Sequence, residues 1–283
     1  MMSFRVLFFL SLLGASVYGQ ELYSALVPFP SSAPPPPPPP SATELALPFP
    51  IGETLTYSIY WGVIGVGESV ATTEWEWIHD QWLIRIQFRT QSNGVLAKLY
   101  PVDDTIKAYV DPETLLPVQF LMDINEGGKT RNSETLFNWQ RKEAYYTKFH
   151  DDKEDEVVTI DLKEGTRDLV SFMYFMRETA FEDQQNYEFE VLSDDKIYEL
   201  EVATDGYDKV KLDEYGKTKS LKLLPEASFE GVFIRKGKME LWLSAKQPQF
   251  LTKLVLDTPF ANVKLLLKKV TGPQADAWEK EQE

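Results

Sequence analysis

Apolar and polar residues alternate with a period of two from Phe49 onward, and this pattern constrains the fold more than any other feature of the chain. Successive side chains of a β-strand point to opposite faces, so the alternation predicts half-buried strands. By this criterion we count roughly 14 strands. Clear examples are residues 55–61, 82–89, 118–124, 198–202 and 239–243.

Short turn signals separate these segments. We expect hairpin tips at 126–129 (Glu-Gly-Gly-Lys), at 193–196 (Ser-Asp-Asp-Lys) and at Asp205-Gly206, since Gly and Asp tolerate the backbone of tight hairpins. Parallel strands need much longer crossovers, so short turns predict antiparallel pairing. The expected fold is all-β: a single large, strongly curved antiparallel sheet that forms a β-roll or an incomplete barrel.

Residues 166–178 break the alternation and predict one short helix near 168–178. Asp168 is a suitable N-cap that can accept from the amide near Ser171. Arg177 falls in the last turn, where a cation suits the helix dipole. We expect a Met/Phe face to pack on the sheet, because four apolar residues recur at helical spacing: Leu169, Phe172, Met173 and Met176.

The N-terminus predicts export. Residues 1–19 combine Arg5, a short apolar run and small residues before Gln20, which is typical of a secretory signal peptide. The run is shorter than the roughly 20 residues that span a bilayer, and we expect no transmembrane span elsewhere. The expected location is the periplasm or cell envelope. We divide the remainder into a Pro-rich disordered linker (20–47), a β domain (48–271) and a polar tail (272–283).

The linker contains seven consecutive prolines, Pro34 to Pro40. Proline fixes φ and lacks a backbone donor, so the run predicts a polyproline II rod. The rod is either a spacer or a docking site for an envelope protein partner with an aromatic groove. Its residues do not distinguish the two.

Charge and cysteine content exclude several classes of function. The net charge is −15, which repels the phosphate backbone of nucleic acids and argues against binding to them. The chain has no cysteine, so it has neither disulfides nor thiolate metal sites. We find no motif that indicates a cofactor or a metal ion.

Three segments carry a resemblance to a known family. Residues 49–67 include Gly52, Glu53, Gly62 and Gly67; the helical segment includes Asp168, Ser171 and Arg177; the third is the strand 238–244. Together they resemble the bacterial family called domain of unknown function 3108, over residues 48–270. The resemblance implies an exported, β-rich envelope protein and assigns these seven residues structural roles. The family's activity is unassigned, and residues 245–247 and Leu251 depart from its pattern.

Enzymatic motifs are sparse. His79 and His150 fall in expected surface turns, and no Gly-x-Ser-x-Gly elbow accompanies them. Asp103-Asp104 and Asp168 could serve a carboxylate-based glycan hydrolase, but the chain has 44 acidic residues, so neighbouring acids mean little. We identify no catalytic residue, and glycan hydrolysis is our third hypothesis.

Tryptophans are the more informative set. Those expected on strands could pack a core or line a space for a lipid, acyl chain or glycan: Trp61, Trp75, Trp77, Trp82 and Trp242. Our first hypothesis is therefore a non-enzymatic envelope protein that binds or carries an apolar or amphipathic ligand. The alternative is a structural or interaction scaffold of the envelope. A Trp-lined cavity would favour the first, and a filled interior would favour the second.

Overall fold

The computed structural model describes residues 36–41, 45–229, 232–233, 239–257, 261–273 and 275. The predicted signal peptide lies outside this part, as does most of the predicted tail. The elements are β1 (Thr54–Trp61), β2 (Ile64–Ile78), β3 (Gln81–Ser92), α1 (Gly94–Leu99), β4 (Asp103–Val110), β5 (Pro117–Glu126), β6 (Lys129–Asn138), β7 (Glu143–Lys148), β8 (Glu156–Asp161), β9 (Arg167–Asp168), α2 (Leu169–Phe175), β10 (Asn186–Ser193), β11 (Lys196–Leu212), β12 (Gly216–Phe229), β13 (Val232–Phe233), β14 (Met239–Ser244), β15 (Leu251–Leu256) and β16 (Val263–Thr271).

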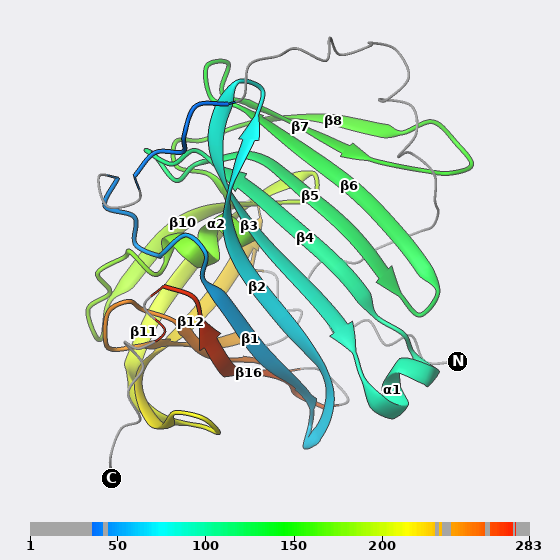
Figure 1. Cartoon of the computed structure of the whole chain (residues 1–283). Helices are drawn as coiled ribbons and strands as arrows, with labels where there is room; N and C mark the ends of the chain where they lie inside the picture. The colour runs from blue at the N-terminus through cyan, green and yellow to red at the C-terminus, as the bar shows by residue number, and fades with distance from the viewer. Residues whose placement is uncertain are drawn as a thin grey trace.

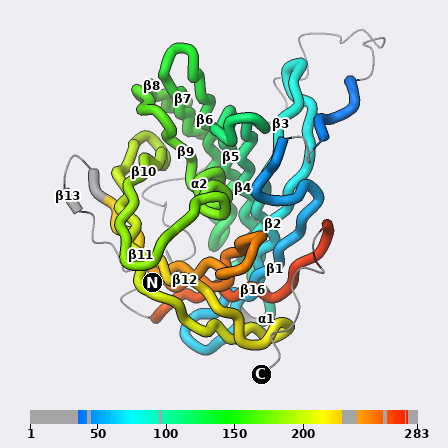
Figure 2. The backbone as a smooth tube through the Cα atoms, turned by 90° about the vertical axis from the view of Figure 1, so that its left-hand side faces the viewer, coloured from blue at the N-terminus to red at the C-terminus, as the bar shows by residue number. Residues whose placement is uncertain are grey.

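The strands form one 16-stranded sheet in the order β8-β7-β6-β5-β4-β3-β2-β1-β16-β15-β14-β12-β11-β10-β9, with β13 paired to β12. Pairing is antiparallel except between β9 and β10. The long strands β2 to β6 lie side by side in Figure 1, and α2 lies between β4 and β10 in Figure 2. β8 and β9 end the order, so the sheet stays open. The prediction of a single curved antiparallel sheet is confirmed.

Helix α2 is where the sequence predicts it, but it packs differently. Asp168 caps it as predicted, because its Oδ1 accepts from the amides of Val170 and Ser171 at 2.8 and 2.9 Å. The helix is enclosed rather than packed by one face: its buried residues are Val170, Ser171, Phe172 and Tyr174. The expected face is confirmed for Phe172 and Met176, which are buried in the core, but Val170 and Tyr174 are buried as well, because the curled sheet surrounds the helix. Arg177 lies beyond the helix end and not in its last turn.

Of the three predicted hairpin tips, two are confirmed and one is not. The tips at 126–129 and 193–196 are confirmed as the β5–β6 and β10–β11 turns. Asp205-Gly206 is not a tip; it interrupts the pairing of β11 with β12 between Thr204 and Tyr207, so the strand continues through it as a bulge. The short helix α1 was not predicted.

Two glycines of the family motif shape the start of the sheet. Gly62 has a φ of 61° in the turn between β1 and β2, a conformation that glycine adopts without strain. A Cβ on Gly67 would lie 2.4 Å from the carbonyl oxygen of Gln91, so only glycine lets β2 approach β3 this closely. Gly52, just before β1, donates its N–H to the carbonyl of Thr73 at 2.7 Å.

A large hydrophobic core fills the space inside the curl. It joins the inner face of the long strands to α2 and to the strands that close over it, with Ile86, Phe88, Phe172, Leu223 and Phe250 among its members. The interior is therefore packed with side chains around the helix. A filled interior favours the scaffold hypothesis over that of a carrier with a Trp-lined cavity.

A buried ion pair joins distant segments of this core. Arg177 donates from Nη1 and Nη2 to the two carboxylate oxygens of Glu53, at 2.6 and 2.9 Å, across 124 residues of sequence. Its Nε donates to the carbonyl of Gln249 at 2.6 Å. The exposed fractions of the two side chains are 3% and 1%. Each of the three guanidinium nitrogens thus has a hydrogen-bond partner, and the rings of Tyr174 and Phe250 lie beside the group, with centroids at 5.0 and 4.8 Å.

Arg177 keeps its charge inside the protein. Burial alone would lower the pKa of Arg177, but the hydrogen bonds and the charge of Glu53 outweigh it, and the pKa is raised. Removing one partner leaves the other charge buried without compensation, which is more costly than removing both.

We expect Arg177→Met to lower the free energy of unfolding by about 3–5 kcal/mol, because Glu53 would remain buried as an unpaired carboxylate. The double variant Glu53→Leu/Arg177→Met should recover a large part of this loss, since it leaves no buried charge. Urea unfolding followed by circular dichroism measures both. Arg89→Met is the matched control, because Arg89 pairs with Asp103 at the surface. A loss at Arg177 no larger than that at Arg89 would contradict the account.

Candidate functional site

The structure divides the five candidate tryptophans among three places. Trp75, Trp77 and Trp82 meet near the tip of the β2–β3 hairpin, with the Trp82 ring centroid 6.5 Å from that of Trp75 and 5.4 Å from that of Trp77. Trp61 lies at the opposite end of β1, and Trp242 lies on β14. No common tryptophan-lined cavity joins them among the described residues. That each binds a ligand stays a prediction.

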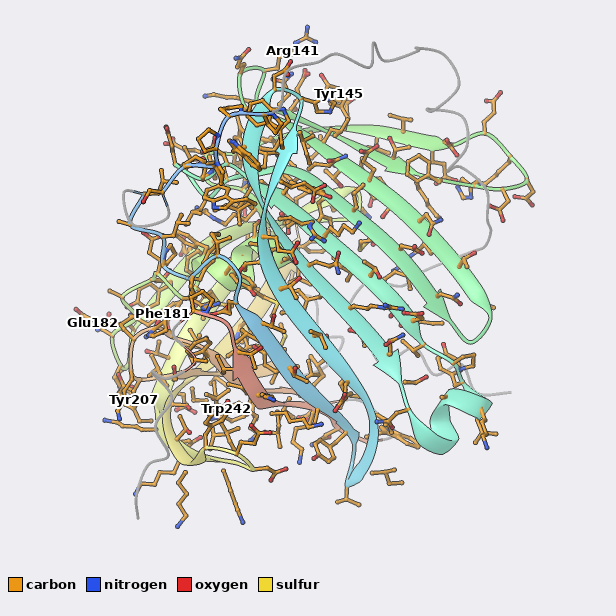
Figure 3. The ribbon with its side chains drawn as sticks, in the orientation of Figure 1. Arg141, Tyr145, Phe181, Glu182, Tyr207 and Trp242 are labelled. Carbon is orange, nitrogen blue, oxygen red and sulfur yellow. The ribbon has the colours of Figure 1, made fainter. Side chains whose placement is uncertain are left out.

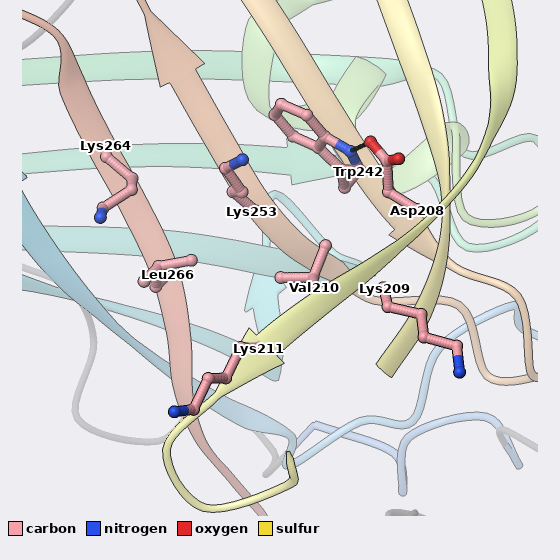
Figure 4. A pocket seen from close by; sticks show the side chains of 8 residues that line it. All are labelled: Asp208, Lys209, Val210, Lys211, Trp242, Lys253, Lys264 and Leu266. Atoms are coloured by element: carbon pink, nitrogen blue, oxygen red, sulfur yellow. Dashed lines mark hydrogen bonds between the residues drawn. The ribbon is translucent and has the colours of Figure 1, made fainter. Parts of the chain in front are cut away.

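Trp242 lies in a cavity of about 330 Å³. It is found at the end of the molecule opposite Arg141 and Tyr145 (Figure 3). Figure 4 shows β11 passing across β14, β15 and β16, with the cavity between them. Its lining residues are Asp208, Lys209, Val210, Lys211, Trp242, Lys253, Lys264 and Leu266.

Strand register brings these side chains together. Trp242 pairs with Lys253, and Lys253 pairs with Leu266, so the three form one row across the same face of β14, β15 and β16. The bulge after Thr204 redirects the second half of β11 over this face. Val210 of β11 is buried there and closes the cavity from the other side.

Trp242 is held in a fixed orientation. Its Nε1 donates to Oδ2 of Asp208 at 2.8 Å, which links β14 to β11. Lys253 Nζ lies 3.7 Å from the centroid of its ring, a cation–π contact. The indole is 3% exposed, so the cavity meets a rigid aromatic surface.

Two lysines give the cavity its charge. Lys253 and Lys264 are half-buried, and burial lowers the pKa of Lys253. Within the described part of the chain, neither forms an ion pair with a carboxylate. The carboxylates that act on Lys253 are bonded elsewhere: Asp208 to Trp242, and Glu240 to Lys222 at 3.1 Å. Each ammonium group lies over an aromatic ring instead, Lys253 over Trp242 and Lys264 over Tyr60.

The remaining lysines lie at the rim. Lys209 and Lys211 are exposed, and Figure 4 shows their side chains pointing away from the centre of the cavity. Lys264, Lys253 and the apolar surface of Leu266, Val210 and Trp242 therefore define the inner site, which we call the lysine pocket. Ammonium groups beside an apolar floor suit a ligand with an anionic head and an apolar body.

Sequence reasoning identified Trp242 but none of the lysines. Lys253 interrupts the mostly apolar segment 251–256, and Lys264 interrupts the apolar run 263–267; those interruptions were the available signal. Their common face depends on the pairing of β15 with β16, and the cover depends on the path of β11. Neither follows from the spacing of residues along the chain.

The candidate carboxylates of a glycan hydrolase each have a structural partner. Asp103 pairs with Arg89 at 3.1 Å, and Asp168 caps α2. Asp104 is buried and accepts from the amide of Asn125 at 2.8 Å. Burial and the neighbouring carboxyl of Glu126 raise the pKa of Asp104 to about 8.

The histidines lie apart from these acids in the fold. His79 is exposed in the turn at the β2–β3 tip, as expected. His150 was expected at the surface and is instead 8% exposed. Its backbone amide donates to the Asp155 carboxylate at 2.9 Å.

Comparisons with known proteins agree with this fold. The family described as "Protein of unknown function (DUF3108)" matches residues 56–268. No curated protein matches the sequence. A crystal structure of a β-barrel-like protein from Brucella abortus, from domain of unknown function DUF1849, superposes with a TM-score of 0.52 at 12% identity, covering 78% of this chain and 97% of that one. This likeness shows a shared fold and nothing more. In the described residues, no helix is long and apolar enough to cross a membrane.

Asp104 should make stability depend on pH. Its raised pKa means that the folded state holds the proton more tightly, so its contribution is complete below the unfolded value of 3.8 and is lost as the pH rises towards 8. We expect Asp104→Asn to raise the free energy of unfolding at pH 8 by about 1 kcal/mol or more. The variant should change little at pH 4. Urea unfolding at both pH values measures the effect.

Asp103→Asn is the matched control for this experiment. The Arg89 hydrogen bond lowers the pKa of Asp103, so its contribution is present above 3.8 and is lost in acid. The control should therefore lose stability at pH 8. If both variants change the free energy of unfolding at pH 8 in the same direction, the raised pKa of the Asp104 carboxyl is contradicted.

Proposed function

Because this chain belongs to the protein family of unknown function DUF3108, whose description assigns no activity, we propose a function from its own site. The protein is a non-enzymatic binding protein of the cell envelope, and its ligand is a small anionic amphipathic molecule. The signal-peptide pattern at 1–19 supports the envelope location. The lysine pocket supports the ligand class.

One observation carries the proposal: in the described part of a strongly acidic protein, Lys253 and Lys264 lie beside an apolar floor without a carboxylate partner. Their ammonium groups lie instead over the rings of Trp242 and Tyr60, at 3.7 and 4.8 Å from the ring centroids. Half-buried ammonium groups lose contacts with water, and an anionic head group would replace those contacts with charge-assisted hydrogen bonds. The floor would bury the apolar body of the ligand, at about 0.8 kcal/mol for each methylene.

The size of the cavity limits the ligand. Its 330 Å³ lies at the small end of the about 300–1,000 Å³ typical of ligand sites. This suits the head and first carbons of a fatty acid or an alkyl phosphate. A carboxylate and a phosphate share the chemistry that the lysines recognise, and separate titrations with decanoate and with decyl phosphate show which of the two binds more tightly.

A scaffold is the second candidate. The observation that favours it is the filled interior, in which α2 and the core occupy the space where a carrier would hold a whole lipid. A scaffold predicts no saturable response to any small molecule, so the same experiment separates the two candidates.

We expect decanoate or decyl phosphate to bind with a saturable change in Trp emission and to raise the melting temperature, because ligand binds only the folded state. An uncharged decyl glucoside should give neither effect. Lys253→Met/Lys264→Met keeps the apolar stems and should weaken binding by tenfold or more, equivalent to about 1.4 kcal/mol. Raised salt should also weaken binding.

Lys209→Met/Lys211→Met is the matched control, since it removes two charges from the rim only. It should change the affinity by less than about threefold, because exposed charges are well screened. Equal binding of the glucoside, or equal losses in the two double variants, would overturn the lysine pocket as the binding site. No saturable response to any probe would leave the scaffold.

A further inference from the structure

The end of the β2–β3 hairpin projects beyond its neighbours. β2 and β3 stay paired up to Ile78 and Gln81, whereas the pairing with β1 reaches only Thr72 on one side, and β4 ends opposite Ile84 on the other. His79 and Asp80 make the turn with φ of 49° and 60°. A two-stranded ribbon of this kind is marginally stable by itself, so its stability depends on the segments that contact it.

Three tryptophans lie on one face of this ribbon. Trp75 and Trp77 alternate along β2, and Trp82 is paired directly with Trp77. The plane of Trp82 is inclined by 74° to that of Trp75 and by 64° to that of Trp77. All three side chains are half-buried, so part of this aromatic surface remains available to another segment.

The segment that contacts this surface is the proline run. Nε1 of Trp82 donates to the carbonyl oxygen of Pro37 at 2.9 Å, across 45 residues of sequence. Pro40 is half-buried and Pro36 to Pro39 are exposed, so the run lies along the surface. Figures 1 and 2 show this dark-blue segment beside the β2–β3 tip.

The chemistry of this contact is that of polyproline recognition. A polyproline II helix has no internal hydrogen bonds, so its carbonyls are free to accept, and its rigidity lowers the entropy lost on docking. Aromatic surfaces bind such helices through ring packing. An indole supplies both a ring surface and a donor, and here the donor is used on a prolyl carbonyl.

We propose that Trp75, Trp77 and Trp82 form a polyproline-binding site on the projecting hairpin, and that its occupant is this chain's own proline run. The site is distinct from the lysine pocket and does not depend on the function proposed above. The tryptophan rings also stabilise the ribbon by packing on one another. That packing does not require the N–H of Trp82 to reach Pro37, so the hydrogen bond is the separate observation.

The test uses the full chain and a variant in which Gly-Ser-Gly-Ser-Gly replaces Pro36–Pro40. A peptide of nine prolines is titrated into each and followed by Trp emission and calorimetry. The variant should bind the peptide saturably, because its site is vacant. The unaltered chain should bind at least tenfold more weakly, because its own run competes. Trp82→Phe in the variant background should abolish binding, whereas Trp61→Phe should preserve it.

Three results would overturn the proposal: no binding to the Gly-Ser variant, equal binding to both chains, or undiminished binding after Trp82→Phe. If Trp82→Phe lowers the melting temperature, peptide binding to the Gly-Ser variant and to the unaltered chain decides the question, because both of these proteins keep every tryptophan. A concentration-dependent dimer of the unaltered chain that disappears in the Gly-Ser variant would show that the occupant comes from a second copy, which contradicts the assignment to the same chain.

Discussion

The buried pair between Glu53 and Arg177 is the interaction on which the arrangement of the whole sheet depends. Glu53 stands just before the first strand, and Arg177 follows the enclosed helix. A bidentate pair at this depth tolerates little displacement, because either charge alone would be costly to bury. The pair therefore ties the segment that follows the helix to the start of the first strand, across 124 residues of sequence.

Both proposed sites lie close in sequence to partners of this pair. The Glu53 amide contacts Oγ1 of Thr73, two residues before Trp75, so the pair adjoins the base of the projecting hairpin. On the other side, Arg177 bonds to Gln249, which leads directly into β15 and Lys253. The aromatic surface and the lysine pocket are thus built on strands whose starting points are held by the same buried charges.

Features that depend on residues close together in the sequence were predictable, and features that depend on distant residues were not. Strand alternation, the turns at 126–129 and 193–196, and the Asp168 cap are local, and each was predictable. The partner of Arg177 lies 124 residues away, so the sequence indicated a dipole contact instead. The lysine pocket was not predicted because it depends on the register between strands and on a bulge that turns β11. The residues of that bulge, Asp205-Gly206, were predicted to form a hairpin tip instead.

Native mass spectrometry of the protein purified from its own cells tests the central claim, that the lysine pocket holds an anionic amphipathic molecule. The account predicts a bound species of a few hundred daltons on the unaltered protein, released as an anion, and its absence from Lys253→Met/Lys264→Met expressed in the same cells. A bare protein mass for the unaltered chain, or the same bound species on both proteins, would contradict it.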